Sequence, residues 1–333
     1  MQIDGIDLDN IGAMSMAPCQ RTAPEDDWVC ARDNGYIPAS LYGLYQRAQF
    51  LSFGAAPRFL SDPDNILFSY SGLVLRSVQQ SLVEAREAQR DFIAANGLVF
   101  DRMKEATGQP WERGADKRAR KNFRDMLIAL STALDSLADL IAIFLPGGIK
   151  GLEVGRSQFS RVEKWLEKPL APLGLIVTPS EHHLNRLHSA LDVLINAPLP
   201  EKDWLPLMRL LRNKSAHLGQ PLFRQVALQA PDGTFFTFIP REWPYLWEQM
   251  MKPIGAATTA QPFPELMRGS LIHQDIESYS AGLIAKVLAV VDAACAVLND
   301  VYEQFRDMPE NQAALAQLRS NFEKYEFLSF VGG

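Results

Sequence analysis

The chain has 333 residues, of which 47% are hydrophobic and 22% are charged, and its formal net charge is −6. This length and apolar content allow one large domain or two ordinary ones with a sizeable core, and they exclude a largely disordered chain. The negative net charge excludes broad, nonspecific adhesion to DNA or to a membrane surface, although it is compatible with a small basic cleft.

The first part of the chain predicts little regular structure. Residues 1–65 are rich in proline, glycine and aspartate, as in APEDDW and GAAPRFLSDPDN, which predicts an irregular N-terminal extension. From Ile66 to Phe92, apolar side chains recur every three or four residues, which predicts a long helix. Asn96 and Gly97 form a typical stop signal, so we expect this helix to end there.

The middle of the chain predicts three further helices. An apolar stripe indicates a helix over about 117–145, which the sequence Pro-Gly-Gly would end. A shorter helix is predicted over 155–168. A capping box, TPSE at 178–181, then opens a helix that runs to about Asn196.

The last third combines helices with one hairpin. A helix is predicted over about 204–217, and the pattern RQVALQ-APDG-TFFTFI at 224–239 predicts a β-hairpin. A long helix over about 275–307 and a short one over 311–324 follow. Because strands do not alternate with helices, we predict a mainly α fold, a bundle of long antiparallel helices with a small hairpin insertion, over 66–330.

Two apolar stretches resemble membrane spans but are interrupted by charge. MLIALSTALDSLADLIAIFL contains Asp135 and Asp139, and LIAKVLAVVDAACAVL contains Lys286 and Asp292. Neither reaches the roughly 18 uninterrupted apolar residues of a span, so both are interpreted as buried helices. The start MQIDGIDLDN is acidic and unlike a secretory signal, which favours a cytoplasmic location.

The cysteines and histidines show no familiar metal-ligand spacing. No CxxC motif is present, and in a reducing compartment the three cysteines are expected to be inert thiols. Three histidines share one predicted helix, where bordering the core is a simpler explanation than metal binding. The cysteines are Cys19, Cys30 and Cys295, and the histidines of this helix are His182, His183 and His188.

One helix end carries an unusual polar cluster, RLLRNKSAHLG at 209–219. Residues four apart share a helix face, so Arg209, Asn213 and His217 should form one polar ridge. Arg212 lies roughly 140° from His217 around a regular helix. The two side chains would converge if the last turn loosened, or if two copies met across a dimer axis.

These residue types suit phosphodiester chemistry. The forked donors of Arg212 match the oxygens of a phosphate and can stabilise charge in the transition state. His217 can exchange protons near neutral pH without special tuning. Asn213 can orient the imidazole or donate to a phosphate oxygen.

The stretch RNKSAH, residues 212–217, resembles the signature of the HEPN superfamily. In that family an Arg is followed by a residue that is usually a polar Asn, Asp or His, and a His follows after a total gap of four to six residues. Arg212, Asn213 and His217 match this pattern position by position. The long helices expected on both sides of the motif are also similar to the helical domains of that family.

The resemblance implies a metal-independent endoribonuclease without cofactors. RNA would be cleaved by attack of the ribose 2′-hydroxyl at a composite site, in which two motifs face each other in a homodimer. The resemblance makes His217 the general acid and base, Arg212 the phosphate ligand and Asn213 the positioning residue. Arg209 and Lys214 are expected to contact the RNA backbone. A role in defence or in a toxin–antitoxin pair, with an antitoxin or regulatory protein as partner, is implied in the same way.

Two other interpretations of the chain stay open. The domain could be a noncatalytic HEPN-like module that binds a nucleotide or a protein partner through the same polar ridge. Alternatively, it could be a purely structural helical protein, in which basic residues at 209–217 only favour a helix C-terminus.

Two further clusters have both functional and structural explanations. The segment DKRARKNFR at 116–124 could supply counter-charges for an RNA strand, or it could be a solvated helix start. Asp135 and Asp139 are four residues apart and could perform acid–base work or pair with a motif arginine. A structural role for the two aspartates is favoured.

Overall fold

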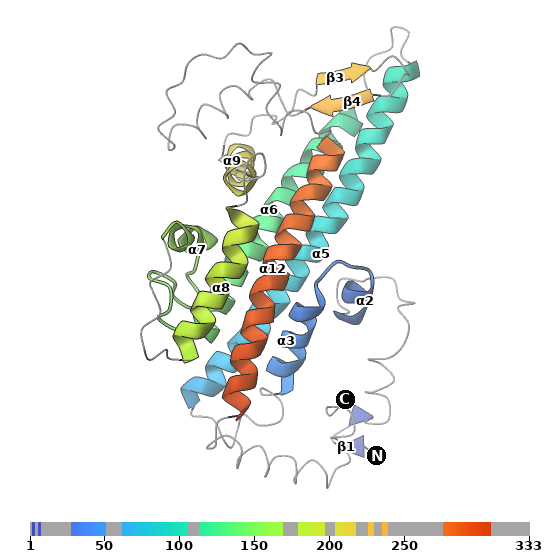
Figure 1. Cartoon of the computed structure of the whole chain (residues 1–333). Coiled ribbons are helices and arrows are strands. Elements are labelled where there is room, and N and C mark those ends of the chain that lie inside the picture. Colours follow the sequence, from blue (N-terminus) through green and yellow to red (C-terminus); the bar gives the residue numbers. More distant parts are fainter. Residues whose placement is uncertain are drawn as a thin grey trace. The chain divides into compact units, whose positions relative to one another are not determined.

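The computed structural model describes residues 2–3, 6–7, 28–50, 62–105, 113–168, 179–196, 204–217, 226–229, 235–238 and 276–307. Within these ranges the chain is mainly helical, as the sequence predicted (Figure 1). The helices are α2 (Trp28–Asp33), α3 (Ala39–Phe50), α5 (Asp62–Glu105), α6 (Arg113–Phe144), α7 (Phe159–Leu166), α8 (Pro179–Ile195), α9 (Trp204–His217) and α12 (Ile276–Asp307). The strands are β1 (Gln2–Ile3), β2 (Ile6–Asp7), β3 (Val226–Gln229) and β4 (Phe235–Phe238).

The chain divides into two compact units, and α5, α6 and α12 each contribute to both. The first unit contains α2, α3 and α7 and most of α8, whereas the second contains α9 and the pair β3 and β4. The first unit is Met1–Val83, Leu134–Ala190 and Val291–Gly333, and the second is Glu84–Ala133 and Leu191–Val290.

In the first unit, α3 is attached to α12 by a polar network. Ser40 Oγ donates to the Asp292 carboxylate at 2.6 Å, and Asn299 Nδ2 donates to the Ser40 carbonyl at 2.9 Å. Arg47 donates to Asn299 and forms an ion pair with Glu303 at 2.8 Å. The expectation of irregular structure over residues 1–65 is therefore wrong for 28–50, because contacts far along the chain stabilise helices that local composition does not favour.

Asp135 and Asp139 of α6 have a structural role in the first unit, which confirms the favoured interpretation. Asp139 Oδ1 accepts the backbone N–H groups of Gly155 and Ser157 at 3.1 and 3.0 Å. Asp135 Oδ1 accepts the N–H of Phe159, the first residue of α7, at 2.9 Å. This carboxylate supplies the negative charge that a helix N-terminus favours, where the local N-cap residue makes no side-chain bond.

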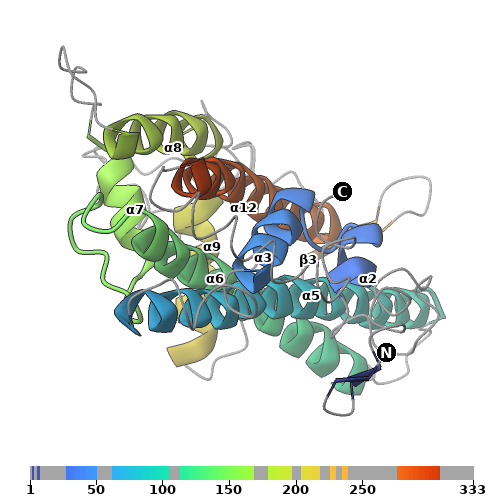
Figure 2. The same ribbon diagram turned by 90° about the horizontal axis from the view of Figure 1, so that it is seen from below.

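The helix α8 begins at Pro179, as its capping box predicted, and lies beside the C-terminal half of α12 in Figures 1 and 2. Arg186 forms an ion pair with Asp300 of α12 at 2.6 Å. His188 is buried, with Nε2 3.0 Å from the Lys168 carbonyl and its ring edge against Trp165. These contacts confirm that His188 borders the core.

In the second unit, α5 packs against both α6 and α12. The rings of Phe92 and Phe123 meet edge to face, with centroids 5.4 Å apart. Gln89 Nε2 donates to the Ser280 hydroxyl at 3.2 Å, and both of these side chains are buried. A buried polar contact of this kind favours a single register of α5 on α12, since a shifted register would leave both groups without partners.

The predicted end of the first long helix at Asn96 and Gly97 is wrong, because α5 continues to Glu105. The Asn96 side chain is fully buried and donates to Glu277 Oε1 at 2.7 Å. Glu277 of α12 supplies a hydrogen-bond partner for the Asn96 amide. Asn96 can therefore stay within α5, and its side chain does not bond to the backbone of a turn instead.

The strands β3 and β4 pair antiparallel, with Val226 opposite Phe238 and Gln229 opposite Phe235. The residues that join them lie outside the described ranges, so the hairpin insertion as a whole stays a prediction. The helix predicted over 311–324 also lies outside the described ranges, as does the end of the expected domain at residue 330, whereas its start at residue 66 lies within α5.

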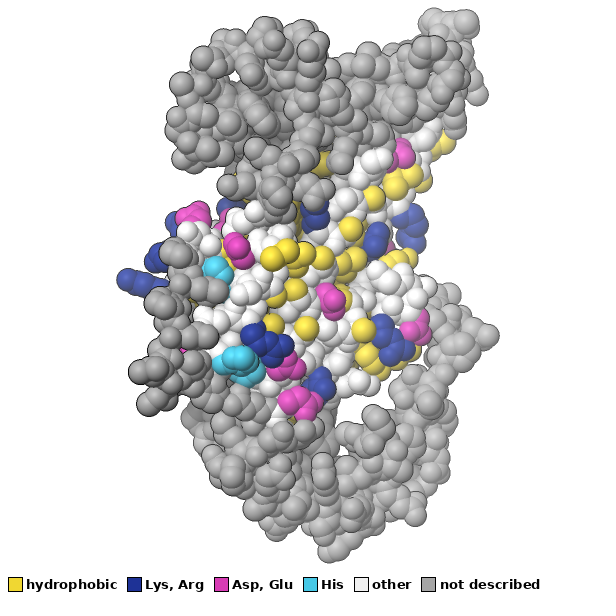
Figure 3. Space-filling view, in the orientation of Figure 1, with side chains coloured by type: hydrophobic (Ala, Val, Ile, Leu, Met, Phe, Trp, Pro, Cys, Tyr) yellow, Lys and Arg dark blue, Asp and Glu magenta, His cyan; other side chains and the backbone are white. Residues whose placement is uncertain are grey.

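Two helical windows are long and apolar enough to cross a membrane by length and composition alone, Lys117–Phe144 and Ile276–Glu303. Of these windows, 67% and 50% respectively are buried inside the protein. The more exposed one, in α12, carries small residues on its outer side, including Ala281, Ala285 and Ala296. Figure 3 shows yellow apolar side chains among scattered charged ones on this face.

The cysteines differ from expectation. Cys30 of α2 is disulfide-bonded, so the prediction that all three cysteines are inert thiols is wrong. A disulfide depends on the separation of two Cα atoms in the folded chain, which no local pattern reveals. Cys295 of α12 is a free, fully buried thiol.

Cys295 is expected to resist alkylation in the native protein. Burial, and then the charge of Asp292, raises the pKa of this thiol far above its usual range, and only a thiolate reacts efficiently. Iodoacetamide at pH 8 should leave the Cys295 peptide unmodified in native protein and modify it after unfolding in urea, as measured by peptide mass spectrometry. Rapid labelling of this peptide without unfolding would contradict the burial of Cys295.

Candidate functional site

The helix that carries the candidate motif, α9, is held in the second unit by its N-terminal half. Trp204, Leu205, Met208 and Leu211 are all buried, and Trp204 Nε1 donates to the Leu194 carbonyl of α8 at 3.2 Å. Burying side chains of this size contributes on the order of 1.5–3 kcal/mol each. Burial of its N-terminal half therefore fixes the position of α9, and with it the backbone of the polar residues at 209–217.

Arg212 and Asn213 contact each other at the polar end of α9. The Nε and Nη2 groups of Arg212 both donate to Asn213 Oδ1, at 3.1 and 3.0 Å. Both side chains are half-buried. The two-pronged contact restricts the guanidinium plane, which fixes the direction in which the other N–H groups of Arg212 point. Asn213 Oδ1 is thus directed at the arginine, whereas the sequence interpretation gave Asn213 to the imidazole or the phosphate.

The structure places the other predicted site residues on the same helix. Arg209 is half-buried one turn before Asn213. The backbone of α9 is helical through Lys214 and His217, whose side chains lie outside the described part of the chain. Because the last turn does not loosen, positions 212 and 217 stay roughly 140° apart around the helix axis. Of the two ways in which these residues could converge, the one that needs a loosened last turn is not observed.

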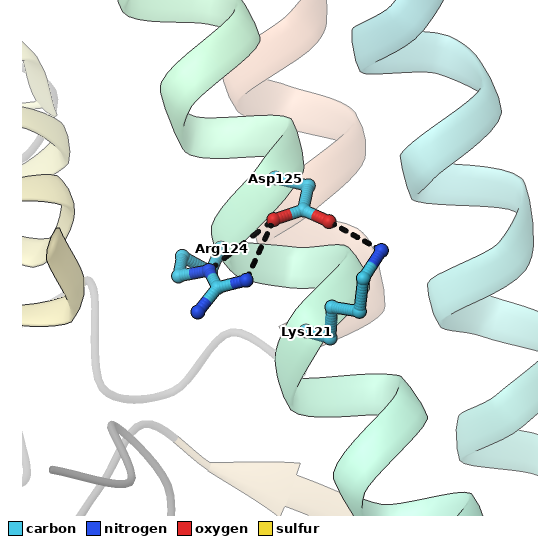
Figure 4. Close-up of polar contacts among 3 residues, drawn as sticks. All are labelled: Lys121, Arg124 and Asp125. Atoms are coloured by element: carbon cyan, nitrogen blue, oxygen red, sulfur yellow. Dashed lines mark hydrogen bonds and ion pairs between the residues drawn. The ribbon is translucent and has the colours of Figure 1, made fainter. Parts of the chain in front are cut away.

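The basic start of α6 belongs to the same unit as α9. Lys117, Arg118 and Lys121 are exposed, and partial burial lowers the pKa of the Arg120 guanidinium. Figure 4 shows Asp125 between two cations of α6, with Lys121 on one side and Arg124 on the side where α9 lies. Lys121 Nζ lies 2.7 Å from Asp125 Oδ2, and Arg124 Nη2 lies 3.1 Å from Asp125 Oδ1.

The described histidines do not form a metal site. His182 and His183 have ring centroids 5.7 Å apart, and His188 contacts Trp165 and a carbonyl instead. Within the described ranges, no group of three or more His, Cys, Asp or Glu side chains is placed to hold a metal ion.

Chemically, the second unit presents a pre-oriented guanidinium and a separate group of exposed cations. The guanidinium can bind one phosphate group with a fixed geometry, and the exposed cations can attract a polyanion. Sequence reasoning missed the contact from Arg212 to Asn213, since neighbours on a helix do not normally face each other. It also missed Asp125, whose role becomes visible only beside its two cationic partners.

No family model matches the chain, and neither the curated proteins nor the solved structures include a significant match.

Proposed function

We propose that this chain is a metal-independent endoribonuclease of the HEPN type, active as a homodimer. The observation that carries the proposal is the contact of Arg212 with Asn213 near the end of an anchored helix, within the stretch RNKSAH. This contact holds a forked cation in one orientation, which is what a transition state with charge on phosphate oxygens requires. The proposed partners are RNA and a second copy of the chain.

The proposed reaction uses only groups of the protein and the RNA. The ribose 2′ oxygen attacks the adjacent phosphorus, forming the O2′–P bond, while the P–O5′ bond breaks. His217 of one copy takes the proton of the 2′-hydroxyl and then, in its protonated form, gives a proton to the departing 5′ oxygen. Arg212 binds the oxygens on which negative charge increases. The products are a 2′,3′-cyclic phosphate and a 5′-hydroxyl.

The regular geometry of α9 supports a composite site. Positions 212 and 217 lie roughly 140° apart on one helix, so a single copy does not present both residues from one helix face. Two helices related by a two-fold axis can present Arg212 of one copy and His217 of the other to the same phosphate. The proposed fold around this site remains a bundle of long helices with a hairpin insertion at about 224–239.

The proposal is tested by incubating the full chain with a labelled RNA pool in EDTA. We expect cleavage that yields 2′,3′-cyclic phosphate ends, is lost when the 2′-hydroxyl is replaced by hydrogen at all positions, and is lost in His217→Ala. A mixture of Arg212→Ala and His217→Ala chains should regain part of the activity if the site is shared between copies. Binding of a nucleotide or a protein without any cleavage would overturn the proposal in favour of the noncatalytic module.

A further inference from the structure

A segment in the first three turns of α6 carries a high density of positive charge. Five basic residues and no acidic residue occupy positions 117–124, in a chain whose net charge is −6. On a helix, like charges three or four residues apart repel each other by about 0.2–0.5 kcal/mol per pair. Lys117 repels Lys121, and Lys121 repels Arg124 in this way. Local charge repulsion that a sequence retains is typical of functional segments.

The cations of this segment are accessible. The side chain of Lys121 is 63% exposed and that of Arg124 is 43% exposed. Lys117 and Arg118 are also exposed, and within the described part of the chain neither forms an ion pair. Spacings of four and three residues place Lys117, Lys121 and Arg124 on one side of the helix. We call these three residues and Arg118 the α6 basic face.

From this arrangement we propose that the α6 basic face binds the phosphate backbone of RNA. The inference rests on the proposed function in one respect, since it takes RNA as the substrate of the site on α9. Phosphate contacts supply most of the affinity of nonspecific RNA binding, and they need accessible cations at short intervals rather than a fixed pocket. Binding here would hold an RNA strand on the unit that contains Arg212.

Asp125 restrains this face. Its carboxylate contacts both Lys121 and Arg124, so it competes with phosphate groups for the same two cations. Asp125→Asn removes the competing charge with almost no change in shape. This substitution should therefore increase RNA affinity, whereas loss of the cations should decrease it. Opposite effects from neighbouring residues distinguish a phosphate-binding face from a face that is merely solvated.

The test measures binding separately from cleavage. The probe is a fluorescein-labelled 12-nucleotide oligouridine with 2′-O-methyl groups, which lacks the attacking hydroxyl. Fluorescence anisotropy is recorded from 50 to 300 mM KCl for the full chain, for Lys117→Glu/Arg118→Glu, and for Asp125→Asn. The control is Lys150→Glu/Arg156→Glu, which reverses two exposed charges in the first unit.

We expect Lys117→Glu/Arg118→Glu to weaken binding about tenfold at 100 mM KCl. The slope of log affinity against log salt should fall in magnitude by about 1.4, which is about 0.7 for each phosphate contact to a single strand. Asp125→Asn should strengthen binding severalfold, and the control pair should change it less than twofold. The melting temperature should not fall in Lys117→Glu/Arg118→Glu, because Glu residues four and three positions before Lys121 form favourable helix pairs with it.

Equal losses in the control pair, or no loss in the α6 pair, would overturn this inference. The outcome is independent of the nuclease proposal. If binding depends on the α6 basic face but natural RNA is never cleaved, the inference stands and the nuclease proposal fails. If RNA is cleaved normally by Lys117→Glu/Arg118→Glu with unchanged affinity, the nuclease proposal stands and this inference fails.

Discussion

Replacing Arg212 with alanine is expected to lower the rate of RNA cleavage by about 100-fold to 1,000-fold without unfolding the protein. A pre-oriented donor to a developing oxyanion contributes an effect of this size. Lysine at the same position should lose nearly as much, although it keeps the charge. An ammonium group lacks the two parallel N–H donors that contact Asn213, so it cannot take one fixed orientation in front of a phosphate.

Single-turnover cleavage of a labelled RNA measures this effect, with thermal unfolding as the readout for the fold. Asn213→Ala is expected to lose about tenfold, because it removes the acceptor that orients Arg212 and leaves the cation in place. Arg161→Lys, at an exposed position of α7, serves as the control and should cleave at the wild-type rate. An Arg212→Lys variant with full activity would show that the charge alone matters and that the forked geometry does not.

Removal of the Asp139 carboxylate is expected to be among the most destabilising single changes on α6. Asp139→Ala leaves the N–H groups of Gly155 and Ser157 without their acceptor, and Ser157 is buried. Hydrogen bonds to a charged group contribute about 1.5–3 kcal/mol each, so the free energy of unfolding should fall by about 3 kcal/mol or more. Asp135→Ala loses one such bond, to Phe159, and should cost about half as much.

Urea unfolding followed by circular dichroism measures both variants. The Asn variants keep an oxygen acceptor and should lose less than the Ala variants, which separates hydrogen bonding from packing. Asp91→Ala, at an exposed position of α5, should change stability by no more than about 0.5 kcal/mol. The structural role assigned to the pair would be wrong if Asp139→Ala unfolded at the same urea concentration as the wild type.

The helices were predictable where burial follows one face. From Ile66 to Phe92, and from Phe123 to Phe144, apolar residues recur at the helical period, and α5 and α6 cover both stretches. The start of α8 at Pro179 and the bounds of α9 were also predicted correctly, since both depend on residues next to each other in the chain. The failures lie at α3 and at Asn96, where contacts with α12 outweigh local preference.

The sequence by itself determined the helical class of this protein and the presence of the stretch RNKSAH on α9, because side-chain periodicity and residue type are local properties. Only the tertiary structure decided which partners the charged groups have. It assigned Asp139 to a loop, Asp125 to two cations of α6, and Asn213 to Arg212. A carboxylate or amide has several acceptable partners, and the choice among them depends on distances that arise only when the chain is folded.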